Sequence, residues 1–333
     1  MATAPAGSPR PRRRWPEAAA GLLVLGSFAL VLRRRWHEVQ ATSWHLQAGW
    51  LALSGVLLAL SYALAGLLWA WALRGVAGRP GLARGVRIWF AANLARYVPG
   101  NLWSFVGAAE LARRDGVARR TTLAVMAVTQ VLSIAVGLAV GLPVLVAERQ
   151  RYGRVALLAA AALLGVALLV LALRGRLAAL LRRRYPGVRR GDLLPGRGRA
   201  LALTGGYLLY WALTGLAFAA FVRSVHPLGV RDVPLAVAAY AAAYAVGFLS
   251  LVAPAGLAVR EGALTVALAP LLPPAAALVV AVLSRVWMML VELAGALAAH
   301  ALDARLAARA ADPGRAAAPS VPGLPRGDDP PGA

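Results

Sequence analysis

The sequence predicts an all-α integral membrane bundle with about seven to eight spans and two Pro/Gly-broken re-entrant segments in pseudo-symmetric positions. The chain of 333 residues is 60% hydrophobic and has a mean hydropathy of +0.66. Uncharged apolar runs recur along it, and about 20 helical residues are enough to cross a hydrocarbon core of ~30 Å. These runs cover residues 48–73, 121–147, 155–173 and 200–222. Their number and length exclude a soluble globular domain.

The distribution of charge predicts the orientation and argues against nucleic acid as a partner. The formal net charge is +23, and all 36 basic residues are arginines. Loops on one predicted side of the membrane hold 21 of them and loops on the other side hold 8, as the excess of positive charge in cytoplasmic loops requires. The richer side comprises 1–14, 74–87, 113–120 and 174–199. We therefore expect a cytoplasmic N-terminus and no separate basic module that would hold nucleic acid.

The chain begins with a basic cytoplasmic tail, residues 1–14, followed by an uncleaved first span at 15–32. This span ends in three arginines and has no small-residue cleavage site, which argues against a signal peptide. Residues 303–333 are rich in proline, glycine and alanine, so we expect a disordered tail after an integral membrane domain at 15–302. The further full spans are expected at 48–73, 121–147, 155–173, 200–222, 233–253 and 274–302.

The first interrupted apolar segment, residues 84–112, is expected to enter and leave on the cytoplasmic side. Pro99 removes a backbone donor and disfavours helical geometry at Val98, and Gly100 then permits a sharp change of direction. A second helix should start near Asn101. Such a break is tolerated at membrane depth only where protein or a water-filled cavity satisfies the backbone. The alternative is an ordinary loop between two short surface helices.

The second interrupted segment, residues 254–272, repeats this pattern with Pro254 and Gly256. Two such breaks, one in each half of the chain, are typical of the central site of a transporter. A half-helix that starts inside the membrane directs unpaired N–H groups and the positive end of its dipole toward an anionic ligand. If this segment crosses fully, the C-terminal tail is cytoplasmic, whereas a re-entrant segment places the tail outside.

Charged residues inside the apolar segments are the strongest indication of a functional site. Arg260 and Glu261 are the only charges between residues 236 and 281. A charge near the bilayer centre costs roughly 2.5–3.5 kcal/mol on insertion scales, so such residues are usually paired, used in function, or both. In the last span, Arg285 and Glu292 are seven residues apart and so project from one face, about 20° apart.

The sequence leaves the pairing of these charges open. The possible partners are Glu110 or Glu292 for Arg260, and Arg96 or Arg285 for Glu261. Such pairs could serve only to fix the helix register. Catalysis and metal binding have little support, because the four histidines lie at span ends and the chain has no cysteine. We expect no catalytic residue, no metal site and no cofactor.

At these same residues the chain resembles the membrane domain of the lysylphosphatidylglycerol synthase/flippase family. The resemblance covers roughly 15–302 and lies in the stretches 96–104, 110–116 and 253–262, and in Ser284, Arg285 and Glu292. It implies a bacterial inner-membrane protein of about eight membrane segments that moves aminoacyl or other lipids between leaflets. Where relatives often have an acidic residue in the middle span, this chain has Gln130.

The resemblance also bears on enzyme activity. In the best-known members, a soluble aminoacyl-transferase domain follows the membrane part. In this chain only the tail of 31 residues follows, so we expect no lipid-aminoacylating activity and no enzyme.

The resulting hypothesis is a flippase-like protein that binds an anionic phospholipid head-group, with or without an aminoacyl group, in a central polar cavity. Glu261, Glu292 and Glu110 would be charge partners that orient the arginines, and the first two could engage an aminoacyl ammonium. The alternative is a non-catalytic membrane partner that presents a phospholipid or polyprenyl-phosphate lipid to a separate aminoacyl- or glycosyl-transferase. The residues expected to hold or line the head-group site are Arg96, Arg260, Arg285, Asn101 and Ser104.

Overall fold

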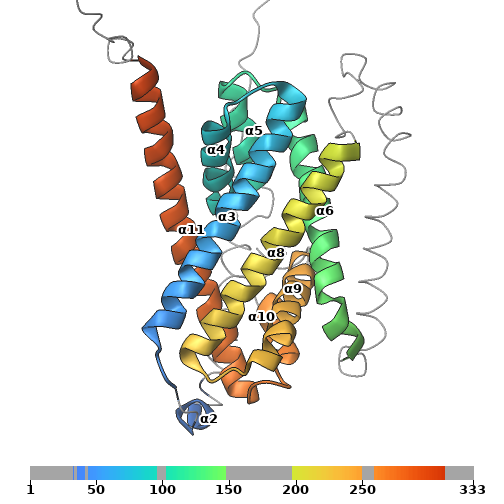
Figure 1. Ribbon diagram of the computed structural model, residues 1–333, viewed down its shortest axis with the longest axis vertical. Helices are drawn as coiled ribbons and strands as arrows, with labels where there is room; N and C mark the ends of the chain where they lie inside the picture. The colour runs from blue at the N-terminus through green and yellow to red at the C-terminus, as the bar shows by residue number, and fades with distance from the viewer. Residues whose placement is uncertain are drawn as a thin grey trace, which may run out of the picture.

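The computed structural model of the protein describes Arg33 and residues 36–41, 44–95, 103–147, 197–249 and 259–311, and within these ranges it is helical, with no strand (Figure 1). The predicted spans at 15–32 and 155–173 lie outside the described residues. The elements, in chain order, are α2 (Trp36–Ala41), α3 (Ala48–Ala77), α4 (Leu82–Leu94), α5 (Trp103–Arg114), α6 (Arg119–Ala147), α8 (Arg197–Val225), the short 3-10 helix η2 (Val230–Asp232), α9 (Val233–Leu249), α10 (Val259–Ala267) and α11 (Pro274–Ala311).

Four of the described helices, α3, α6, α8 and α11, are long and apolar enough to cross a membrane. Their outer faces carry large apolar side chains that are exposed, which suits contact with lipid and not with water. On α3 these are Leu53, Val56, Leu60 and Leu67, and on α11 they are Leu283, Val286, Leu290, Leu293 and Leu297. The predicted spans at 48–73, 121–147, 200–222 and 274–302 are therefore confirmed as helices, each extended by a few residues.

Helices α4 and α5 form a hairpin whose two outer ends lie together. Arg84 near the start of α4 bonds Asp115 just after α5, with Nη2 and Oδ1 2.7 Å apart. The chain then turns at Gly116, whose φ of +78° is a left-handed conformation that glycine adopts without strain. In Figure 1 this hairpin occupies the upper half of the bundle, beside the end of α3. We call this the arginine-rich end, because it carries Arg74, Arg84, Arg87, Arg113, Arg119 and Arg199.

Helices α9 and α10 form a second hairpin, which enters the bundle from the opposite end (Figure 1). The two helices approach closely at Gly247, where an added Cβ would lie 2.5 Å from the Cβ of Arg260. The nine residues of α10 are about 13 Å long, too short to cross a membrane. The expected full span at 233–253 is therefore wrong: α9 ends at Leu249 and is one arm of this re-entrant hairpin.

The sequence left the side of the C-terminus open, and this second hairpin determines at which end of the bundle α11 finishes. Because neither α9 nor α10 crosses fully, α11 runs from the hairpin's end of the bundle to the arginine-rich end. There Asp303 bonds Arg87 of α4, with an N–O distance of 2.7 Å. Helix α11 continues to Ala311, nine residues beyond the boundary at 302 that composition predicted. The reason is local, since alanine, leucine and arginine in 303–311 are strong helix formers.

The described helices form an inverted repeat. One unit is α3, the α4–α5 hairpin and α6, and the other is α8, the α9–α10 hairpin and α11. Leu94 and Leu249 end α4 and α9, and Arg119 and Pro274 begin α6 and α11, so each pair is 155 positions apart. The packing follows the same relation: α6 packs on α9 as α11 packs on α4, and α3 meets α8 between the units. Two hairpins thus reach the middle of the bundle from opposite ends.

Candidate functional site

The charged residues singled out in the sequence meet where α10 starts against α11. Arg260 and Glu261 occupy the first turn of α10 and are 8% and 2% exposed. The side chain of Arg285 on α11 is 15% exposed. Arg285 lies 11 residues after Pro274, which is about 16 Å along the helix axis from the start of α11. The site is therefore deep in an apolar bundle.

A single carboxylate oxygen holds two guanidinium groups. Glu261 Oε1 accepts a hydrogen bond from Arg285 Nη1 at 2.6 Å and another from Arg260 Nη1 at 3.3 Å. Both are charge-assisted bonds, which are stronger than neutral ones. Two positive charges share one negative charge, so this triad has a net charge of +1. We call Arg260, Glu261 and Arg285 the arginine triad.

Tyr240 and Met288 add further contacts to Arg260. Its guanidinium carbon lies 5.1 Å from the ring centroid of Tyr240 on α9, a cation–π distance. Arg260 Nη2 and the Tyr240 hydroxyl both donate to the Met288 sulfur, at 3.4 and 3.1 Å. Tyr240 and Met288 could not be recognised as site residues from the sequence, because apolar spans commonly contain both residue types. Glu261 therefore holds both arginines through ion pairs, while Tyr240 and Met288 hold Arg260 through a cation–π contact and a hydrogen bond to sulfur.

Glu292 is fully buried on the same inward side of α11 as Arg285. The seven residues between them correspond to about 10 Å along the helix, toward the arginine-rich end. Neighbouring residues Val291 and Ala296 pack against a cluster that includes Leu58 and Phe90. The prediction that one face of α11 points into the bundle therefore holds for both charged residues.

Glu110 is not part of the arginine triad. It bonds Arg113 at 2.8 Å and Arg119 at 2.5 Å, at the arginine-rich end of the bundle. Its side chain is 33% exposed. Hydrogen bonds from these two arginines lower the pKa of Glu110 to about 2. Its expected role as a partner of Arg260 is therefore corrected: nearby surface arginines satisfy this carboxylate.

The remaining predicted residues divide between α5 and segments that the structure does not describe. Ser104 is partly buried in the first turn of α5. The other predicted residues lie outside the described residues: Arg96, Pro99, Gly100, Asn101, Pro254 and Gly256. Within the described ranges, no three histidine or acidic side chains are grouped so as to hold a metal ion.

The fold and the site define a multi-pass helical membrane protein built as an inverted repeat around a buried charged cluster. A family model described as the lysylphosphatidylglycerol synthase TM region matches residues 18–295. The chain belongs to this family, as its sequence motifs indicated. No curated protein matches the chain by sequence.

Proposed function

We propose that this protein moves a membrane lipid with an anionic head-group between leaflets, and that the arginine triad binds the head-group phosphate. The observation that carries the proposal is the placement of two guanidinium groups, those of Arg260 and Arg285, side by side at the start of the half-helix α10 inside the bundle. Glu261 holds both groups in place, and a phosphate that enters the site can accept hydrogen bonds from the same pair. Arginine suits this role because its planar fork binds phosphate through two parallel bonds and stays charged.

The location of the triad supports transport over static binding. Arg260 and Glu261 occupy the first turn of a half-helix, where unpaired N–H groups and the helix dipole favour an anion. The hairpin belongs to an inverted repeat, the architecture in which one unit rocks against the other around a central site. We further propose a bacterial inner membrane, with the arginine-rich end and the N-terminus cytoplasmic, and a non-enzymatic role for this chain.

The test is transport of fluorescent phosphatidylglycerol by purified protein in proteoliposomes, comparing wild type with Arg260→Ala. Losing charge-assisted bonds of about 1.5–3 kcal/mol should slow movement roughly 10- to 100-fold. The fold should survive, because Glu261 keeps its 2.6 Å bond to Arg285. Arg231→Ala is the matched control, since this arginine is exposed in η2.

Arg260→Ala moving lipid at the wild-type rate, with equal incorporation, would refute the site. Wild-type protein that retains phosphatidylglycerol through purification but moves none would refute transport. That result would favour the second role, presentation of a lipid to a separate aminoacyl- or glycosyl-transferase. Recovery of most activity in Arg260→Lys would show that charge matters more than the planar fork.

A further inference from the structure

Two tryptophans of α3 mark where the bundle meets the two membrane surfaces. Arg223 of α8 lies over the Trp50 ring, with its guanidinium carbon 4.3 Å from the ring centroid, and Arg199 of α8 lies over Trp71 at 4.8 Å. Tryptophan and arginine both favour the boundary between hydrocarbon and water. Trp71 follows Trp50 by 21 residues, or about 31 Å along the helix, which matches a hydrocarbon core of ~30 Å. The Trp71 boundary belongs to the arginine-rich end.

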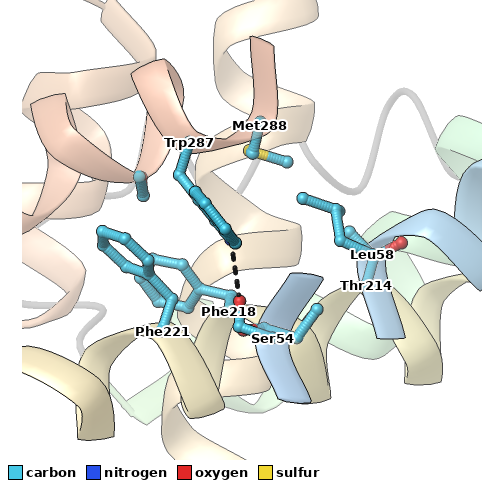
Figure 2. Close-up of a pocket in the computed structure, with 9 residues that line it drawn as sticks. Ser54, Leu58, Thr214, Phe218, Phe221, Trp287 and Met288 are labelled. Carbon is cyan, nitrogen blue, oxygen red and sulfur yellow. Dashed lines mark hydrogen bonds between the residues drawn. The ribbon is translucent and has the colours of Figure 1, made fainter. Parts of the chain in front are cut away.

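The arginine triad lies nearer the opposite boundary. Figure 2 shows the Trp287 indole of α11 pointing to Ser54 of α3, where Nε1 donates to the serine Oγ at 3.1 Å. Ser54 is four residues from Trp50 and 17 from Trp71, or about 6 and 25 Å along α3. Arg285 precedes Trp287 by two residues on α11. A lipid from the arginine-rich side must therefore carry its head-group through most of the membrane to reach the triad.

Between the triad and the arginine-rich end, α11 packs against α4 of the other repeat. We call this contact the α4–α11 seam. Gly295 lies ten residues after Arg285, and an added Cβ there would lie 2.6 Å from the Phe90 ring, so the ring rests directly on the backbone of α11. Farther along the helix, Asp303 Oδ2 lies 2.7 Å from Arg87 Nε. An aromatic ring and an ion pair therefore hold the two helices together along this route.

The equivalent contact in the inverted repeat, between α9 and α6, is built differently. Arg87 corresponds to Ala242 at the separation of 155 positions, and Ala242 belongs to a buried apolar cluster. An added Cβ at Gly141 of α6 would lie 2.7 Å from the Ala242 backbone nitrogen, so these helices touch backbone to backbone. Separating two closely packed backbones loses contacts that nothing replaces. Water can solvate both members of a partly exposed ion pair, and a phenylalanine ring can turn to another rotamer. The α4–α11 seam is therefore the more easily opened of the two contacts.

We propose that the α4–α11 seam is the gate through which a lipid head-group passes between the arginine triad and the leaflet at the arginine-rich end. This inference rests on the proposed function and adds to it the route and the parts that move. In this structure the gate is closed, with Phe90 on Gly295 and Arg87 paired with Asp303. Opening separates α4 of one repeat from α11 of the other, which is the relative motion that an inverted repeat provides. Once released, the Arg87 guanidinium can bind the phosphate that passes it.

The first experiment locks the gate. Because the chain has no native cysteine, a short, reducible bifunctional thiol reagent can join the double variant Arg87→Cys/Asp303→Cys across the seam. Transport of fluorescent phosphatidylglycerol is measured in proteoliposomes before linking, after linking and after reduction. We expect linking to slow transport roughly tenfold or more, because only the open state passes lipid, and reduction to restore it. Arg84→Cys/Asp115→Cys is the matched control: this pair is also 2.7 Å apart at the same end, but it lies within the α4–α5 hairpin, so its link should not change transport.

A second experiment measures opening without transport. Ala299 is 8% exposed and lies in the same buried cluster as Phe90, so Ala299→Cys reports access to the seam. Its rate of labelling by a membrane-impermeant maleimide is measured from the arginine-rich side. Adding Asp303→Asn should raise this rate about two- to fivefold, the change in open population expected from weakening a partly exposed ion pair. Adding Asp115→Asn weakens the Arg84 pair instead and should leave the rate unchanged.

Unchanged transport after linking across the seam would overturn the proposal, and so would equal slowing by both links. Equal labelling of Ala299→Cys with Asp303→Asn and with Asp115→Asn would overturn it as well. If the cysteine pair at 87 and 303 moves no lipid before linking, the labelling comparison decides. The two proposals fail separately. Absence of lipid movement by wild type refutes transport, whereas a linked seam that still passes lipid refutes the gate and leaves the proposed function standing.

Discussion

Removing the negative charge of Glu261 should destabilise the protein more than removing either arginine. Glu261→Gln keeps the shape and one acceptor oxygen, but it removes the negative charge that bonds both Arg260 and Arg285. Arg285→Gln, in contrast, leaves Glu261 bonded to Arg260. The structure therefore predicts that Glu261→Gln lowers the stability more than Arg285→Gln does.

The magnitude follows from the burial of this carboxylate, which is 2% exposed. Breaking a buried ion pair by removing one partner costs about 3–5 kcal/mol, because the remaining charge is buried and uncompensated. For a chain of this size, that corresponds to a fall in Tm of roughly 5–10 °C. The double variant Glu261→Gln/Arg285→Gln removes one charge of each sign, so it should recover about 1–3 kcal/mol relative to additivity.

The assay is thermal unfolding in detergent, followed by tryptophan fluorescence. Glu110→Gln is the control, because Glu110 also bonds two arginines, Arg113 and Arg119, but its side chain is 33% exposed. Solvent screens such pairs, so this variant should change the Tm little. The reasoning would be refuted if Glu261→Gln and Glu110→Gln shifted the Tm equally, or if the double variant were merely additive.

Three further predictions concern the hairpins and the arginine-rich end. Gly247→Ala places a Cβ 2.5 Å from the Cβ of Arg260. This variant should lower the free energy of unfolding by about 1–3 kcal/mol and slow lipid transport. Gly262→Ala is the control, because its Cβ meets nothing within 4 Å, and it should change neither stability nor transport. The pKa of Glu110 is depressed to about 2. Its stabilising contribution, which solvent screening keeps small, is therefore present above its ordinary pKa of about 4.5 and is lost as pH falls from there to about 2. The small Tm difference between wild type and Glu110→Gln at neutral pH should shrink to zero over that range. The chain has no native cysteine, so single cysteines can report the topology. A membrane-impermeant maleimide should label Ala307→Cys from the cytoplasmic side and Val230→Cys from the opposite side. Labelling of both positions from the same side would refute the proposed placement of the two ends of the bundle.

The spanning helices could be predicted from the sequence because the hydrocarbon core imposes a minimum length on an apolar helix. The predicted run 48–73 corresponds to α3 (Ala48–Ala77), and the predicted run 274–302 corresponds to most of α11. The segment 233–253 was mistaken for a span because it, too, is an apolar run of about the length that crosses a membrane. Its composition is as apolar as that of α3, and hydropathy does not show whether such a helix crosses the membrane or turns back against α10.

The candidate site was partly predictable. Arg260 and Glu261 were found because charges are rare at membrane depth, and the partner Arg285 was one of two that the sequence allowed. Tyr240 and Met288 could not be found, because their role depends on the packing of α9 and α11 around Arg260. The pairing of Glu110 with Arg260, one of the alternatives that the sequence left open, is wrong, because Arg113 and Arg119 bond this carboxylate.

The inverted repeat offers a comparison for the view that the arginine triad only fixes how α10 packs on α11. The separation of 155 positions relates Phe105 and Val106 of α5 to Arg260 and Glu261 of α10, and Gln130 of α6 to Arg285 of α11. The packing is also equivalent, since α5 packs against α6 as α10 packs against α11.

Buried positions correspond as well: Val125 and Thr129 in one repeat match Val280 and Ser284 in the other. The first hairpin thus packs on its long helix with no ion pair at the positions that correspond to the triad. A buried ion pair is weak evidence for stability, because apolar side chains of similar volume often stabilise as well or better. The triad is therefore not required to set the register of a half-helix on a span, which favours a role in binding an anion.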